Sequence, residues 1–322
     1  MKKKVLMFSA ILAFITSLVG DGASASCPDT SKGETPQDCP WAEITRATDG
    51  VTDFTKIRAI IDAGIPGFMN QVEKDAQEKE LLDMWGLSSN IDASQITTGI
   101  KTIPENLLRY FVSLWKVSYN QDFTQGFAGL NHTYGYLFSN LQTKYGYKRA
   151  RWVQGEIEAG LNLPAGLLSG QPKKGTLFSN LTRFIGPIAF RDLDQLPRGL
   201  HSNIHELRHY DYSKLRTIRL MEVAEDHDQY LELRTDIAPF IAPNPNGGDT
   251  ALLIYSIDFR HPDEEANPKL ITAFPINNDM INSVMDAKLW GNKVTLKLNY
   301  NAVLATKLSD EFMSHGKRYL LP

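Results

Sequence analysis

The spacing of hydrophobic residues changes part-way along this 322-residue chain, and that change limits the folds it can adopt. In the first half, apolar residues recur three or four positions apart, which is the spacing of one face of an α-helix. Pro104 suits the start of such a helix, where a missing N–H costs little. The residues that carry this helical pattern are Phe54, Ile57, Ile60, Ile61, Phe68, Val72, Ala76, Leu107, Leu108, Phe111, Val112 and Trp115.

The second half has the composition and period of β-strands. Polar residues 225–229 join two β-like segments, which predicts a hairpin, and Asn277–Leu289 has a helical pattern. The predicted strands are Thr217–Ala224, Tyr230–Ala238, Ala251–Phe259, Lys269–Ile276 and Lys293–Tyr300. We therefore expect an α+β fold, with a helical N-terminal half followed by a mainly antiparallel β C-terminal half.

The N-terminus has the pattern of a cleaved signal peptide. Three lysines precede an apolar segment that is too short to span a bilayer, and Ala23-Ser24-Ala25 follows as a cleavage site. We expect residues 1–25 to be removed and the mature protein to be exported, to the periplasm or beyond, with no later membrane span. In that oxidising compartment Cys27 and Cys39, the only cysteines, should form a disulfide.

These patterns divide the mature chain into three regions. Residues 26–50 form a disulfide-closed N-terminal segment, and residues 51–150 form a helical region. Residues 151–322 form an α+β region whose antiparallel sheet packs on the helical region. No linker rich in glycine, proline or serine separates them, so the division rests on periodicity alone.

Charge gives little sign of a partner. The chain carries a net charge of −3, and the loss of three lysines and Asp21 with the signal peptide leaves −5. An acidic protein has no general attraction for nucleic acid. Basic clusters such as Lys148, Arg149 and Arg151 are expected to be solvated faces.

Two further patterns allow more than one interpretation. The aromatic-rich segment 123–152 could pack in the core or form a platform for a carbohydrate or peptide. Glu156 and Glu158 alternate on a possible strand, Gln154–Leu161, where solvated acids are more common than a glycosidase pair.

The segment His205-Glu206-Leu207-Arg208-His209 has metal-binding spacing. If 196–210 is helical, His205 and His209 lie on one face and can share a zinc ion, with Glu206 as the base for a bound water. A third ligand would come from Glu222, Glu225 or Asp228. The five residues resemble the zincin metallopeptidases, which implies a zinc-dependent hydrolase; Arg208 and the missing downstream glycine and histidine depart from that pattern.

A second set of residues resembles the EndoU endoribonucleases. The resemblance covers Gly199-Leu200-His201-Ser202, Tyr210-Asp211-Tyr212 and the segment Lys269–Pro275. It implies that His201 and Lys269 act in catalysis, with His132 as the upstream histidine, and that RNA is the substrate. A third possibility is an exported protein without catalysis that binds a partner through its aromatic first half. The three functions stay open on sequence grounds.

Overall fold

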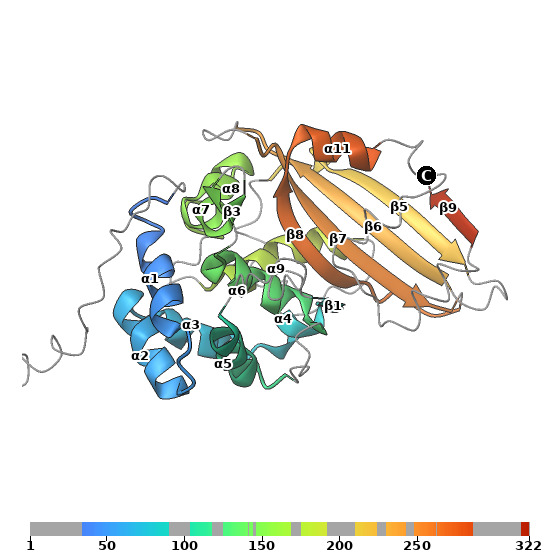
Figure 1. Ribbon diagram of the computed structural model, residues 1–322. Coiled ribbons are helices and arrows are strands. Elements are labelled where there is room, and N and C mark those ends of the chain that lie inside the picture. Colours follow the sequence, from blue (N-terminus) through green and yellow to red (C-terminus); the bar gives the residue numbers. More distant parts are fainter. Residues whose placement is uncertain are drawn as a thin grey trace, which may run out of the picture.

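The computed structural model describes residues 34–89, 104–117, 125–140, 142–143, 146–168, 175–191, 210–223, 230–242, 248–261, 263–285 and 317–321. Helices gather in the first half and a five-stranded antiparallel sheet forms in the second, which confirms the α+β prediction. In Figure 1, helices α1, α2, α3 and α5 lie on one side and the sheet on the other, with α4, α6 and α9 between them.

The described helices before the sheet are mostly short and amphipathic. They are α1 (Cys39–Thr48), α2 (Phe54–Gly64), α3 (Phe68–Asp75), α4 (Lys79–Asp83), α5 (Glu105–Trp115), α6 (Ala128–Phe138), α7 (Lys148–Val153), α8 (Glu156–Gly160) and α9 (Leu177–Ala189). Pro104 is the N-cap of α5, and the apolar positions predicted for that helix are all buried. The 3.6-residue period therefore located α2, α3 and α5 correctly.

Helix α9 is buried on nearly all sides and links the helices to the sheet. Its N-cap Thr176 accepts a hydrogen bond from the Ser179 amide, and the Ser179 hydroxyl in turn accepts from the Thr176 amide. This capping box satisfies amide groups that a helix leaves unpaired at its start. One hydrophobic cluster runs from α9 to the sheet, and includes Phe178, Ile185, Leu252 and Ile254.

The sheet has the strand order β8-β7-β6-β5-β9, with every neighbouring pair antiparallel. Its strands are β5 (Arg216–Val223), β6 (Tyr230–Pro239), β7 (Ala251–Arg260), β8 (Lys269–Ile276) and β9 (Lys317–Leu321). Four of them match predicted strands closely. The predicted strand Lys293–Tyr300 lies outside the described residues. Helix α11 (Asn278–Met285) follows β8 as predicted.

Smaller elements complete the fold. Strand β1 (Leu87–Ser89) pairs with β2 (Gln125–Phe127), and β3 (Gln142–Thr143) pairs with β4 (Gly146–Tyr147). The chain just before β1 lies along the outer edge of β8, because the Gly86 amide donates to the Leu270 carbonyl and the Leu270 amide donates to the Met84 carbonyl. That edge of the sheet is thereby covered.

Two expectations about polar residues need revision. Residues Glu156–Gly160 form helix α8 and not a strand, since Gly155 adopts a left-handed φ of 76° and Glu158 is buried, accepting from the Leu168 amide at 2.9 Å. The expected solvated face at α7 is wrong as well. Arg149 is buried and pairs with Glu34, and Arg151 is buried and pairs with Asp249.

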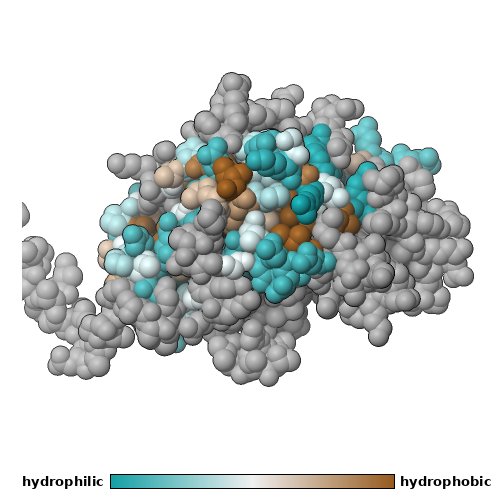
Figure 2. Space-filling view, turned by 90° about the horizontal axis from the view of Figure 1, so that it is seen from above, coloured by the Kyte–Doolittle hydropathy of each residue, from teal (hydrophilic) through white to brown (hydrophobic). Residues whose placement is uncertain are grey.

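The aromatic segment is core. Tyr134, Tyr136, Phe138 and Trp152 are all buried, and Tyr136 stacks on Trp152 with the ring centroids 5.0 Å apart. The large apolar side chains that are exposed among the described residues are Phe54, Tyr212 and Ile241. Figure 2 shows hydrophobic residues in small separate areas among hydrophilic ones on the face seen from above.

Candidate functional site

The predicted zinc site is not supported. Among the residues that the structure describes, no group of three or more His, Cys, Asp or Glu side chains could hold a metal ion. Glu222 lies in β5, in register with Leu231 of β6 and Arg318 of β9. The other predicted residues of this site lie outside the described part of the chain: His205, Glu206, His209, Glu225 and Asp228. The prediction of a metal-binding group is corrected on this finding for the described residues. Hydrolase activity stays a prediction.

The structure also does not test the predicted signal peptide or export. The proposed signal peptide and Cys27 lie outside the described residues, so Cys39 at the start of α1 is the only described cysteine. Cys39 is disulfide-bonded, and its predicted partner Cys27 lies outside the described residues. Within the described part of the chain, no helix is both long and apolar enough to cross a membrane.

Two of the three residues of the ribonuclease hypothesis are described, and they lie in unlike surroundings. His132 is buried in α6, where its ring stacks on Tyr136 with centroids 6.1 Å apart. Lys269 begins β8, and its Nζ donates to the Asp83 carbonyl oxygen at 2.6 Å. His201 lies outside the described residues. The roles of these three residues stay a prediction.

A different group of polar residues comes together on the sheet. Residues directly opposite each other in an antiparallel sheet point to the same face. The register places Thr217, Asp236 and Ile254 side by side on β5, β6 and β7. Ile254 belongs to the hydrophobic cluster shared with the helices, so this is the face that the helices cover.

Two charged rows follow along the same face. Arg219, Arg234 and Ser256 lie opposite one another on the three strands. Two residues further along, Glu232 of β6 lies opposite Asp258 of β7. We call the set Arg191, Thr217, Arg219, Glu232, Arg234, Asp236, Ser256 and Asp258 the charged layer.

Asp236 is the most buried member of the charged layer, with no exposed surface. Thr217 Oγ1 donates to its Oδ1 at 2.6 Å, Arg191 lies 2.9 Å from the same oxygen, and Arg234 lies 3.4 Å from Oδ2. Burial raises the pKa of Asp236, and Arg234, Thr217 and Arg191 oppose that rise.

The end of α9 positions both arginines. Arg191 donates to the Ile188 carbonyl at 2.6 Å, and Arg234 donates to the Ala189 carbonyl at 3.2 Å. Cations are favourable at a helix C-terminus, where carbonyl groups lack intrahelical partners. The sheet and α9 thus fix the layer from two sides.

The charged layer passes from solvent at β5 to the interior at β7. The Arg219 side chain is 38% exposed, and Arg191 is 30% exposed. Glu232, which accepts from Arg219 Nε at 2.6 Å, is largely buried, and Asp258 accepts from the Asn267 amide at 3.1 Å in a buried position. Solvent therefore reaches the layer from its β5 side.

Ser256 is the least satisfied member. Its side chain is 1% exposed, and its Oγ has no hydrogen-bond partner among the residues that the structure describes. A β-bulge between Tyr255 and Ser256 shifts the register of β7 against β8 at this position. Bulges of this kind are common beside functional sites, where they redirect a side chain.

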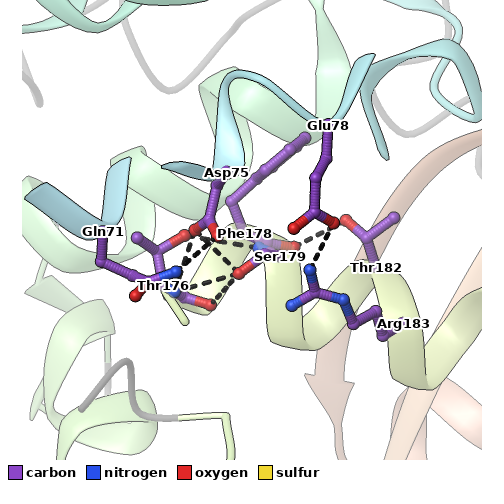
Figure 3. A network of polar contacts seen from close by, with 8 residues as sticks. All are labelled: Gln71, Asp75, Glu78, Thr176, Phe178, Ser179, Thr182 and Arg183. Carbon is purple, nitrogen blue, oxygen red and sulfur yellow. Dashed lines mark hydrogen bonds and ion pairs between the residues drawn. The ribbon is translucent and has the colours of Figure 1, made fainter. Parts of the chain in front are cut away.

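A second buried polar network joins α3 to α9 (Figure 3). At its centre, the Asp75 carboxylate accepts three hydrogen bonds. Asp75 accepts from the Thr176 amide at 3.1 Å, Ser179 Oγ at 2.8 Å and Gln71 Nε2 at 2.9 Å. Beside it Arg183 donates to Glu78 at 2.6 Å, on the surface. We call Gln71, Asp75, Thr176 and Ser179 the Asp75 junction.

The Asp75 junction is structural. Its carboxylate lies at the N-terminus of α9, where negative charge and accepted amide hydrogen bonds both stabilise the helix. Burial, and to a lesser extent the negative charge of Asp75, raises the pKa of Tyr134. Ser179 is completely buried, and its hydroxyl is engaged with Asp75 and with both backbone groups of Thr176.

Sequence reasoning missed the charged layer. Its signal is the alternation of Glu232, Arg234 and Asp236 with Leu231, Leu233 and Ile237 in one strand. By the usual rule the charged positions would face solvent. The structure instead buries both faces, since Ile237, Leu253 and Tyr255 on the opposite side are buried too.

No known protein-family model, curated protein or solved structure matches this chain in the comparisons.

Proposed function

We propose that this protein binds a small charged ligand, and that the charged layer on the helix-facing side of the sheet is its binding site. The observation that carries the proposal is the buried Ser256 hydroxyl without a partner, in one row with Arg219 and Arg234. A buried hydroxyl without a hydrogen bond is unfavourable by about 1–3 kcal/mol. A ligand that accepts a hydrogen bond from Ser256 would remove this cost.

The arrangement of charges supports the same proposal. Arg219 lies directly opposite Arg234, and Glu232 lies directly opposite Asp258. Like charges opposite each other destabilise a sheet, so a fold selected for stability alone would alternate their signs. Groups with a perturbed pKa, such as Asp236, cluster at functional sites.

The proposal places the site differently from the sequence hypothesis of an aromatic platform. The aromatic residues of the first half pack in the core, whereas the charged layer lies on the sheet and reaches solvent near Thr217 and Arg219. A binding function is retained, but its surface is on β5, β6 and β7.

Two-dimensional NMR with the full chain tests the proposal. The probes are butanoate, butylamine, 4-aminobutanoate and inorganic phosphate, each added up to millimolar concentrations. We expect at least one probe to shift the amide signals of β5, β6 and β7 in a saturable way. Arg219→Gln should weaken that binding about tenfold, because the guanidinium lies at the solvent side of the layer.

Arg216→Gln is the matched control. Arg216 is also an exposed arginine on β5, but it lies opposite Ile237 and so points to the other face of the sheet. It should bind the probe as the unaltered protein does. Absence of saturable shifts with all four probes, or equal weakening by the two substitutions, would contradict a ligand site at the charged layer.

A further inference from the structure

We infer that Thr217 is a nucleophile that takes an acyl group from an activated ester, with Asp236 as its base and Arg191 beside the attacking oxygen. The inference goes beyond the proposed binding function and does not depend on Ser256. Three parts of the chain meet at this point, since Thr217 belongs to β5, Asp236 belongs to β6 and Arg191 follows α9. A hydroxyl is a weak nucleophile unless an adjacent base activates it.

The hydrogen bond between Thr217 and Asp236 runs in the direction that this chemistry needs. Thr217 Oγ1 donates to Asp236 Oδ1 at 2.6 Å, which is within the reach of a general base. Burial raises the pKa of Asp236 and so makes its carboxylate a stronger base than an ordinary aspartate. Arg234 and Arg191 oppose that rise and favour the ionised form, which a base must have.

Arg191 bridges the hydroxyl and the carboxylate. Its Nη2 donates to Thr217 Oγ1 at 2.7 Å, and its Nη1 lies 2.9 Å from Asp236 Oδ1. The carbonyl oxygen of an ester under attack is one carbon atom away from Oγ1, so this guanidinium can stabilise the oxyanion that forms there. The pairs that the three side chains already make are therefore the ones that acyl transfer requires.

Thr217 is open to an ester that arrives from solvent. It is exposed, whereas its neighbour Ile218 is buried, and the Arg191 side chain beside it is 30% exposed. The described strand β9 pairs with β5 from Arg219 to Val223 and so stops short of Thr217. The base is thus buried, and the nucleophile faces solvent.

Ser213 provides a contrast in the same part of the chain. Its Oγ donates to Asp211 Oδ1 at 2.5 Å, but both of these residues are exposed. Hydrogen bonds from Ser213 lower the pKa of Asp211, so this carboxylate is a weaker base than Asp236. We expect Ser213 to stay unmodified where Thr217 is acylated.

The reaction transfers an acyl group without oxidation or reduction. Thr217 Oγ1 forms a bond to the carbonyl carbon of the ester while its proton passes to Asp236. The bond from that carbon to the leaving oxygen then breaks, and the leaving oxygen takes the proton from Asp236. The products are an acyl ester of Thr217 and a free alcohol or phenol.

Acetylation of the full chain with p-nitrophenyl acetate tests the inference. Absorbance follows the released p-nitrophenol, and mass spectrometry of tryptic peptides locates the acetyl group, since trypsin cuts after Lys214 and Arg216 and so separates Ser213 from Thr217. We expect an acetyl group on Thr217 that Thr217→Val removes. Ser213→Ala is the matched control and should leave acetylation of Thr217 unchanged. Acetyl groups on lysine side chains alone, or on Ser213 as much as on Thr217, would overturn the inference.

Two substitutions test the partners of Thr217. Asp236→Asn keeps an oxygen for the hydroxyl but removes the base, so it should slow acetylation of Thr217 about a hundredfold. Arg191→Gln should slow it about tenfold, because the cation beside Oγ1 is lost. Circular dichroism establishes that each variant is folded. An unaltered rate in folded Asp236→Asn overturns the inference, and if that variant does not fold, an unaltered rate in Arg191→Gln does so.

Discussion

Asp75 and Asp236 are both carboxylates without exposed surface, yet they accept from different kinds of donor. Asp75 receives the backbone amide of Thr176 and two neutral side chains, whereas Asp236 receives one hydroxyl and two guanidinium groups. The first arrangement provides a partner for a buried backbone N–H group, and every folded protein must pair such groups. The second pairs side chains only, and apolar side chains could take the place of all of them.

This difference shows how the geometry of a buried polar group can separate a structural role from a functional one. The Asp75 junction completes the start of a buried helix and leaves its serine fully engaged. The charged layer places like charges side by side and leaves its serine without a partner among the described residues. The predictions below test that contrast, beginning with the largest effect.

Asp75→Ala should lower the free energy of unfolding by about 4 kcal/mol, because buried donors lose charged hydrogen bonds worth about 1.5–3 kcal/mol each. Urea unfolding followed by circular dichroism measures the change. The control is Asp62→Ala, which removes an exposed ion pair with Arg58 and should cost less than about 1 kcal/mol. Similar losses for the two variants would show that the Asp75 junction is not structural.

Asp236→Leu should lower the free energy of unfolding by about 3 kcal/mol, since it removes the carboxylate that pairs with buried Arg234 and with Arg191. Adding Arg234→Met should recover most of that loss, because an apolar pair of similar volume needs no desolvation of charge. Denaturant unfolding of the single and double variants gives the comparison. A double variant less stable than the single one would place the charged layer among the structural networks.

The two buried serines should respond in opposite ways to loss of the hydroxyl. Ser179→Ala should cost about 1–2 kcal/mol, because the Thr176 amide and Asp75 each lose a partner. Ser256→Ala should raise the free energy of unfolding by about 1–3 kcal/mol without ligand, because it removes a buried hydroxyl that has no partner among the described residues. Thermal unfolding measures both, and a large loss for Ser256→Ala would reveal a structural hydrogen bond there.

The smallest expected effect is on pH dependence. The pKa of Asp236 is raised in the folded protein, so the folded state binds its proton more tightly than the unfolded state does. As pH falls through the folded pKa, the unaltered protein should therefore gain stability relative to Asp236→Asn. We measure the free energy of unfolding of the unaltered protein minus that of Asp236→Asn, at pH values just above and just below the folded pKa. This difference should increase toward acid pH, and a constant difference contradicts the raised pKa.

Much of the fold could be predicted from the sequence. Helices α2, α3 and α5 and strands β5 to β8 follow from periodicity, because local burial dictates which positions are apolar. Helix α8 could not be predicted, since its short length and the left-handed Gly155 carry no periodic signal. The pairing of β9 with β5 joins segments far apart in the chain, and no local pattern encodes such a contact.

The candidate site was harder to predict from the sequence than the fold was. Glu232, Arg234 and Asp236 alternate with apolar residues and so indicate a solvent-facing strand. Their burial depends on Arg191 at the end of α9 and on Thr217 in β5, which only the tertiary fold brings near. The short motif at His205, by contrast, is conspicuous in the sequence, yet the described residues provide no group of metal ligands.

The pairing of β5 with β9 also has a consequence for synthesis. A ribosome makes β5 first among the strands of the sheet, and β9 follows roughly 90 residues later, which takes on the order of 5–20 s. For that interval the edge of β5 lacks this partner strand, and an open strand edge is a template for pairing with other chains. The nascent protein therefore exposes this edge to pairing with other chains until its last described strand emerges.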